Sequence, residues 1–131
     1  MIFRLKRKIK FLFQRLSRGF DDSDTWDLQD TFYRWLLPRL RRFRDVTCAY
    51  PMHYKNHGEW LKELNTRICQ LTAIVNVNEL DFEDRSYIPK EELKKWEKVG
   101  AGDCSLNALS YDYCVRDFNK WFCENIGDLW W

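Results

Sequence analysis

The stretch that decides the fold is residues 2–28, IFRLKRKIKFLFQRLSRGFDDSDTWDL. Its apolar residues recur at steps of three and four, the spacing that places side chains on one face of a helix. These residues are Ile2, Leu5, Ile9, Leu12, Leu16 and Phe20. Gly19 is able to end this helix, and the side-chain oxygens of residues 21–24 are able to cap the next one. The stretch therefore predicts two helices joined by a turn and packed as a long antiparallel pair.

The second predicted helix runs from about residue 25 to residue 44. Asp27 and Asp30 lie near its start and four arginines lie near its end, so each charge lies where the helix dipole favours it. Pro38 lacks a backbone donor and crowds the carbonyl of Arg34, which predicts a kink or a break. The expected apolar face comprises Leu28, Phe32, Trp35, Leu36, Leu40 and Phe43.

The remaining residues predict three more helices. Residues 46–58 lack helical periodicity and contain turn formers, which indicates a loop. Helices are expected at about 59–77 and 103–126, with a short one after Pro89 that ends at Gly100. Gly127 is expected to cap the last helix. That helix is expected to bury Cys104, Ala108, Tyr111, Val115, Phe118, Phe122 and Ile126.

The composition and length predict one all-α domain. The chain has 131 residues, of which 45% are hydrophobic and 17% aromatic, and this excludes a disordered chain. No internal repeat or flexible linker interrupts it. We therefore expect a single-domain bundle of four to five helices that spans residues 1–131.

Several features bear on the compartment. The longest apolar runs are only a few residues long, whereas a membrane-spanning helix needs roughly 20. The basic N-terminus lacks the separate apolar core and cleavage site of a signal peptide, so we expect it in the mature protein. Five cysteines without a Cys-x-x-Cys pair favour a reducing compartment. The cytoplasm is the expected location.

The two parts of the chain carry opposite charge. Residues 1–44 contain twelve Lys or Arg and five acids, whereas residues 45–131 contain ten basic and fifteen acidic residues. The first eighteen residues hold seven basic side chains and no acid. Such a helix is able to lie on an anionic membrane or to follow a phosphate backbone, or its charges form the solvated face of a helix packed on the domain.

The candidate metal ligands are weak. Cys48, His53 and His57 have a spacing compatible with a metal site, but a fourth ligand is missing and Pro51 interrupts the segment. The aspartates of residues 21–27 lack the spacing of a calcium loop. Helix capping, or pairing of Asp21 or Asp22 with arginines of the neighbouring helix, explains them better. The sequence predicts no metal and no cofactor.

Catalytic motifs are missing from the sequence. It has no Gly-x-Ser-x-Gly elbow, and its histidines and cysteines do not follow the order of a known triad. The run 100–102, Gly-Ala-Gly, lacks the lysine of a phosphate-binding loop. We therefore predict that the protein is not an enzyme.

Two motifs carry a resemblance to a known family. Residues 18–28, RGFDDSDTWDL, and the later Leu37-Pro38-Arg39-Leu40 resemble a family of small uncharacterised proteins of tailed bacteriophages. The basic N-terminal helix and the Glu59-Trp60 pair agree with the same pattern. The resemblance implies a phage origin, a helical fold and a location in the host cytoplasm. It implies no catalytic residues.

The leading functional hypothesis is a non-enzymatic phage accessory protein. It would bind a host or phage macromolecule, for example as an anti-CRISPR-like inhibitor of a bacterial defence system or of another host process. Two alternatives stay open: nucleic-acid binding by the basic first half, and peripheral membrane attachment by the amphipathic N-terminal helix. Seven tryptophans exceed the needs of a small core, and Trp and Arg often anchor interfaces. The candidate partner-binding residues are Arg39, Arg41, Arg42, Arg44, Glu79, Asp81, Glu83, Asp84, Trp130 and Trp131.

Overall fold

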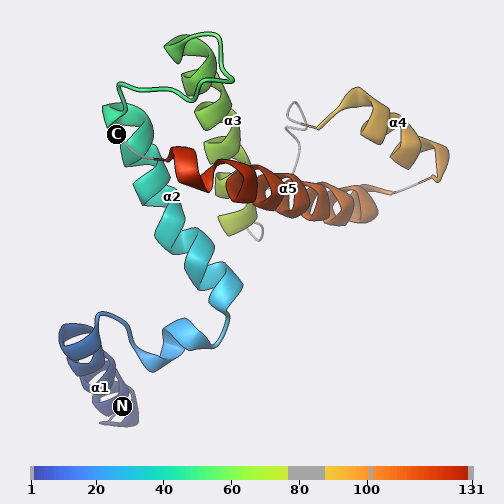
Figure 1. The fold of residues 1–131 in the computed structure, drawn as a ribbon. Helices are drawn as coiled ribbons and strands as arrows, with labels where there is room; N and C mark the ends of the chain where they lie inside the picture. Colours follow the sequence, from blue (N-terminus) through green and yellow to red (C-terminus); the bar gives the residue numbers. More distant parts are fainter. Residues whose placement is uncertain (1, 77–87, 101, 130–131) are drawn as a thin grey trace. The chain divides into compact units, whose positions relative to one another are not determined.

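The protein is an all-α chain (Figure 1). The computed structural model describes residues 2–76, 88–100 and 102–129, with the side chains of 103–107 left out. Within these ranges there are five α-helices, two short 3-10 helices and no strand, which confirms the predicted fold class. The elements are α1 (Ile2–Arg18), η1 (Asp22–Thr25), α2 (Leu28–Val46), α3 (His57–Val75), α4 (Lys90–Lys98), α5 (Asp103–Asn125) and η2 (Ile126–Asp128).

The chain divides into two compact units where the sequence suggested one domain. The first unit comprises residues 1–35 and the second comprises residues 36–131. Helix α1, in the first unit, contains no buried residue. Within the first unit α1 packs against η1, and the long antiparallel pairing expected of the first two helices is not seen there. Within that unit η1 follows α1 along the chain and contacts its polar face.

The turn after α1 was partly predicted. Gly19 has a φ of +83°, and its N–H donates to the carbonyl of Arg15 at 3.0 Å, which confirms that glycine ends the helix. The predicted start of the second helix near residue 25 is wrong, because Asp21 caps η1 instead. Helix α2 begins at Leu28, where the carboxylate of Asp27 accepts the N–H of Asp30 at 3.0 Å.

Two further expectations concern the interior and the end of helices. Pro38 lies inside α2, and the helix continues past it to Val46, so the chain does not break there. Gly100 has a φ of +68° and ends α4 as predicted. Gly127 is not in the left-handed region and lies within η2, so the predicted cap at this glycine is wrong.

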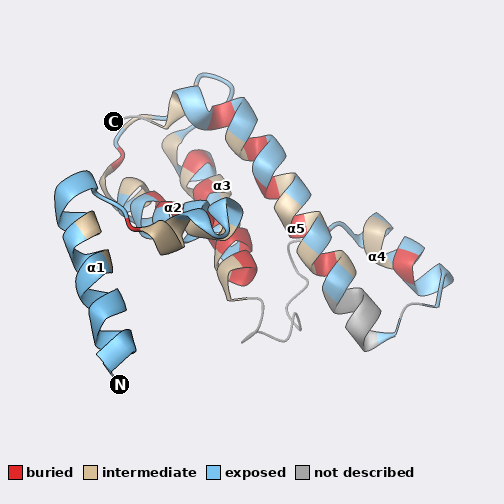
Figure 2. Ribbon diagram, turned by 90° about the horizontal axis from the view of Figure 1, so that it is seen from below, coloured by how far each residue is buried: buried red, intermediate tan, exposed pale blue. Residues whose placement is uncertain are grey.

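Helices α3 and α5 form the core of the second unit. Figure 2 shows a row of buried residues along each of these helices. Trp60 and Leu64 of α3 and Phe118 of α5 are fully buried, and the rings of Trp60 and Trp121 lie 6.2 Å apart. Burying a side chain of this size contributes about 1.5–3 kcal/mol. The aromatic contact between α3 and α5 therefore supplies much of the stability of this unit.

The buried face of α5 differs from the predicted one. Among its described side chains, the buried positions are Ser110, Cys114, Phe118, Trp121 and Asn125. Of the predicted face, Phe118 is buried, whereas Ala108 and Ile126 are exposed. The spacing of hydrophobic residues does not predict that Ser110 and Asn125 are buried. The side-chain N–H of Asn125 donates to the carbonyl of Trp121 at 2.9 Å, which satisfies the donor of this buried amide.

A partly buried ion-pair network joins α3 to α5. Arg67 donates to Glu63 at 2.7 Å and to Asp117 at 2.6 Å, and its guanidinium lies 5.6 Å from the ring centre of Trp121. The buried amide of Gln70 donates to Asp117 at 2.8 Å. Burial acts to lower the pKa of Arg67, but the hydrogen bond to Glu63 and the charge of Asp117 outweigh it and raise that pKa. These contacts give Arg67 a structural role.

The apolar face predicted for α2 is only partly buried. Leu36 and Leu40 are buried, as are Tyr33 and Leu37. The earlier members of the predicted face, Leu28, Phe32 and Trp35, are exposed by 68%, 37% and 51%. The burial of α2 therefore changes along its length, near the boundary between the two units.

Candidate interaction surface

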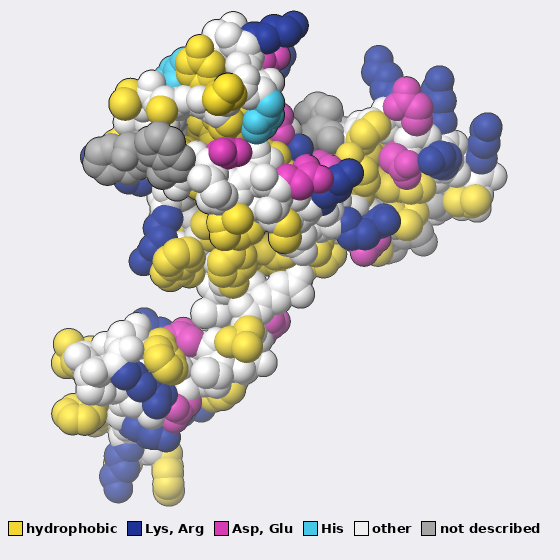
Figure 3. Space-filling view, in the orientation of Figure 1, with side chains coloured by type: hydrophobic (Ala, Val, Ile, Leu, Met, Phe, Trp, Pro, Cys, Tyr) yellow, Lys and Arg dark blue, Asp and Glu magenta, His cyan; other side chains and the backbone are white. Residues whose placement is uncertain are grey.

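Helix α1 exposes an apolar face to solvent. At 100° per residue, six side chains fall on one side of the helix, and they are exposed by 58–78%. We call this set the apolar face of α1; it comprises Ile2, Leu5, Ile9, Leu12, Phe13 and Leu16. Figure 3 shows hydrophobic and basic side chains together on the surface of the unit that carries α1.

Basic side chains occupy most of the rest of α1. The helix carries seven Lys or Arg and no Asp or Glu. Lys6 and Lys8 lie at the two borders of the apolar face, by the same helical geometry. The full set is Arg4, Lys6, Arg7, Lys8, Lys10, Arg15 and Arg18. The helix therefore presents an apolar strip edged by positive charge.

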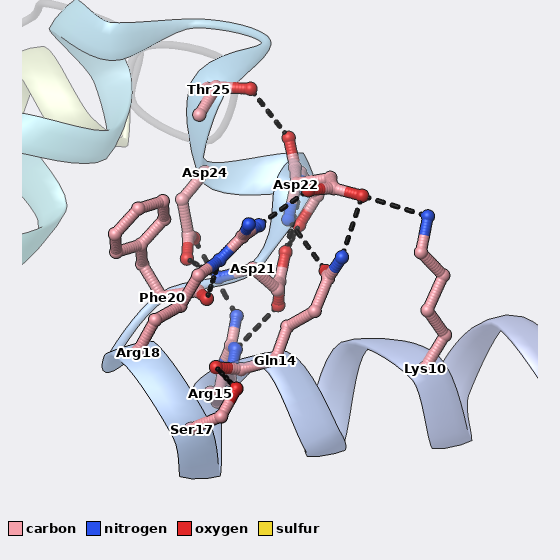
Figure 4. Close-up of polar contacts among 11 residues, drawn as sticks. Lys10, Gln14, Arg15, Ser17, Arg18, Phe20, Asp21, Asp22, Asp24 and Thr25 are labelled. Atoms are coloured by element: carbon pink, nitrogen blue, oxygen red, sulfur yellow. Dashed lines mark hydrogen bonds and ion pairs between the residues drawn. The ribbon is translucent and has the colours of Figure 1, made fainter.

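The acidic turn η1 binds the opposite side of α1 (Figure 4). The carboxylate of Asp22 accepts from Gln14 at 2.8 Å and from Arg18 at 2.5 Å, and it pairs with Lys10 at 2.9 Å. In return, the side-chain oxygen of Gln14 accepts the N–H of Asp22 at 3.0 Å. All four contacts involve Asp22, so this aspartate holds the turn against the helix.

Asp21 forms the buried part of the same contact. It is 1% exposed and accepts from the Nε of Arg15 at 2.5 Å. It also accepts the N–H and the hydroxyl of Ser23, while its own N–H donates to Asp24 at 2.9 Å. This reciprocal capping fixes η1. We call the contacts of Asp21 and Asp22 with α1 the acidic clamp; its pairing of aspartates with arginines of the neighbouring helix was predicted and is confirmed.

Both clamp carboxylates are held in their charged form. Hydrogen bonds from Gln14, Lys10 and Arg18 lower the pKa of Asp22 far below its usual range. The hydrogen bond from Ser23 lowers the pKa of Asp21, although burial acts in the opposite direction. The clamp therefore carries two negative charges at neutral pH, which partly offset the positive charge of α1.

The clamp determines which face of α1 stays open. The residues that contact the turn, together with Phe11 beside Trp26 at 6.2 Å between ring centres, centre on the side opposite the apolar face. Within the first unit the apolar face is therefore uncovered. The cations divide into two groups along the helix. Lys10, Arg15 and Arg18 are paired with aspartates, whereas no ion pair within the described residues involves Arg4, Lys6, Arg7 or Lys8.

A cleft of about 570 Å³ lies within the first unit, a volume typical of small-molecule sites. Aromatic and aliphatic side chains line much of it, and Phe32 and Trp35 are stacked with ring centres 6.3 Å apart. Its two arginines are engaged locally, Arg15 with Asp21 and Arg34 with Asp30 at 2.8 Å. The cleft therefore gives this unit further apolar surface, whereas both of its arginines are already paired with aspartates.

The predicted arginine cluster has mixed roles. Arg41 donates to Thr72 at 3.1 Å and Arg44 donates to Asn65 at 3.0 Å, so both connect α2 to α3 within the second unit. Arg39 also makes a polar or ring contact, and Arg42 is exposed. Arg41 and Arg44 therefore help to hold α2 to α3, and their role in partner binding stays a prediction. The other predicted partner-binding residues, Glu79, Asp81, Glu83, Asp84, Trp130 and Trp131, lie outside the described residues.

The weak metal candidates have other contacts. A ring nitrogen of His57 lies 3.0 Å from the carbonyl of Thr47, and the ring of His53 lies 4.5 Å from that of Tyr54. Cys48 is exposed with a free thiol. In the part of the chain that the structure describes, no three His, Cys, Asp or Glu side chains gather as a metal site would require.

Sequence reasoning noted the basic amphipathic helix but left its residues out of the predicted contact set. The available signal was the strip of apolar residues at steps of three and four with Lys6 and Lys8 beside it. Comparison with protein-family models, curated proteins and solved structures gives no match. Across residues 2–76, 88–100 and 102–129, no helix has the length and apolar content needed to span a membrane.

Proposed function

We propose that this protein acts by binding, and that α1 docks it on a negatively charged macromolecular surface. The observation that carries the proposal is that α1 has seven cations, no acid and no buried residue. A helix with a packing role alone would bury its apolar face. This one keeps both its apolar face and its basic borders accessible within the first unit.

The unpaired cations define the centre of the contact. Lys10, Arg15 and Arg18 are already neutralised in part by the acidic clamp, so Arg4, Lys6, Arg7 and Lys8 are the charges best able to meet a partner. Clustered positive charge attracts an anionic partner over about a Debye length, some 8–10 Å at physiological ionic strength. Binding is therefore expected to weaken as salt is added.

This proposal fits the hypothesis of a non-enzymatic phage accessory protein. A small protein that docks on a cellular surface is able to block or relocate a host process without catalysing a reaction. Inhibition of a bacterial defence system remains a prediction about the consequence of docking.

The test compares two charge-reversal variants. K6E/K8E reverses the border cations, and K94E/K98E makes the same change at exposed positions of α4 as a control. We expect K6E/K8E to lower affinity for anionic beads and anionic vesicles by at least about thirtyfold, because each of the two lost cations near such a surface is worth roughly 1 kcal/mol. Equal retention of the wild-type protein and K6E/K8E, or equal loss in the control, would contradict the proposal.

A further inference from the structure

The apolar face of α1 indicates which kind of anionic partner the helix binds best. A partner that supplies only negative charge would satisfy the lysines and arginines but would leave six apolar side chains in water. We propose that the surface is an anionic lipid leaflet, and that α1 lies in its interface with the apolar face toward the acyl chains. This inference rests on the proposed function and names the partner of the same helix.

A second copy of the chain is a poorer partner. The Ile and Leu residues from Ile2 to Leu16 follow one another at alternating steps of three and four, a spacing that resembles a coiled-coil seam. However, the positions beside that seam include Lys6, Lys8 and Arg15, so two copies would bring like charges together. The strip also covers little more than two heptads, whereas three to four are typical of a coiled coil. Charge therefore favours an acidic partner over self-association.

Nucleic acid is also a poorer partner. Single-stranded nucleic acid binds through aromatic side chains on which bases stack, and phosphates are bound by cations. Five of the six residues of the apolar face are Ile or Leu, which offer no stacking surface. A duplex would contact the basic borders and gain nothing from the aliphatic strip.

A bilayer interface matches both properties of α1. The helix has 17 residues and is therefore about 25 Å long, enough to lie in the plane of the leaflet. Interfacial helices bury an apolar face about 5–10 Å deep and keep Lys and Arg at the level of the headgroups. Lys6 and Lys8 lie where their ammonium groups are able to reach phosphates while their carbon chains border the apolar face.

The acidic clamp sets how strongly the helix binds. Asp22 holds Lys10 and Arg18, so these cations compete between the aspartate and lipid phosphates. Removing the carboxylate charge in D22N frees them for the lipid. We expect D22N to bind anionic vesicles about fivefold more tightly, the effect of roughly one additional cation near the surface.

The experiment measures flotation of the full chain with two kinds of vesicle, phosphatidylcholine alone and phosphatidylcholine mixed with phosphatidylserine. I9S/L12S removes apolar area from the middle of the face, and M52S/V99S removes exposed apolar side chains from the second unit as a control. We expect the wild-type protein and M52S/V99S to float with the mixed vesicles only. I9S/L12S is expected to bind them at least tenfold more weakly, because each substitution removes most of an aliphatic side chain from the lipid.

The outcomes separate this inference from the proposed function. If I9S/L12S floats like the wild-type protein while K6E/K8E does not, docking by charge stands and the lipid-embedded helix is wrong. If both variants float like the wild-type protein, the proposed function fails as well. Tighter binding to duplex DNA than to the mixed vesicles, retained in I9S/L12S, would also overturn the lipid assignment. Folding is checked by circular dichroism, which we expect to be unchanged because α1 buries no residue.

Discussion

The two units of this protein are stabilised in different ways. In the second unit, α3 and α5 pack through fully buried Trp60, Leu64 and Phe118. In the first unit, α1 buries nothing and is held to η1 by the charged and polar contacts of Asp21 and Asp22. A helix held by its polar face keeps its apolar face available. Burial stabilises the second unit, whereas under our proposal the first unit provides the contact with a partner.

The largest expected effect compares equivalent truncations in the two units. Trp60→Ala removes a fully buried ring from the core and is expected to lower the free energy of unfolding by about 3–5 kcal/mol. Leu12→Ala acts on a side chain that is 59% exposed, so its effect is expected to stay within about 0.5 kcal/mol. Urea denaturation followed by tryptophan fluorescence measures both. A loss from Leu12→Ala as large as that from Trp60→Ala would show that α1 is packed.

A smaller effect is expected from the ion pairs. Arg67→Ala removes the ion pairs of Glu63 and Asp117 and leaves Asp117 only the hydrogen bond from Gln70, so we expect a loss of about 2 kcal/mol. Arg34→Ala removes an exposed pair with Asp30 and is expected to cost less than about 1 kcal/mol. The same denaturation assay compares the two variants. Similar losses of unfolding free energy in both variants would show that partly buried and exposed ion pairs contribute equally to stability.

The end of α1 provides a local test. Gly19 has a left-handed backbone with φ +83°, and a Cβ there would meet no atom within 4 Å. Gly19→Ala is therefore expected to cost about 1 kcal/mol through the backbone alone. Hydrogen exchange should show faster exchange at the C-terminal end of α1 and no change in α3. Unchanged exchange in α1 would mean that the turn does not depend on glycine.

The smallest expected effect is the response of the clamp to acid. The pKa values of Asp21 and Asp22 are lowered by folding, so the stability that they contribute is present above the usual aspartate pKa near 3.9 and is lost as pH falls through the lowered values. We expect the NMR signals of η1 to stay unchanged from pH 7 to about pH 4 and to shift only below it. A shift centred near the usual pKa would contradict the clamp, and D22N serves as the control.

The sequence predicted the presence of the helices better than it predicted which of their faces are buried. Gly19 marks the end of α1 because glycine alone adopts the left-handed turn without strain, and this local signal was readable. The buried face of α5 was not readable, because the polar residues Ser110 and Asn125 lie among its buried positions and hydrophobic spacing does not mark them. Pro38, where the sequence predicts a kink or a break, lies within a helix that continues to Val46.

The candidate surface was readable only in part. The charge of α1 and the pairing of its arginines with Asp21 or Asp22 follow from composition and spacing. Whether the apolar strip is buried or exposed does not, since a packed helix and an interfacial helix share the same periodicity. Arg41 and Arg44 also donate hydrogen bonds to α3, which the clustering of arginines in the sequence did not indicate.

The most direct test of the central claim locates α1 in a bilayer. NMR spectra of the full chain are recorded with phosphatidylserine-containing bicelles that carry a spin label among the acyl chains. We predict that the methyl signals of Leu5, Ile9 and Leu12 broaden strongly, while those of Leu64 and Leu71 in the core of the second unit do not. Methyl signals of α1 that stay as sharp as those of α3 would contradict the claim that the apolar face of α1 enters the lipid.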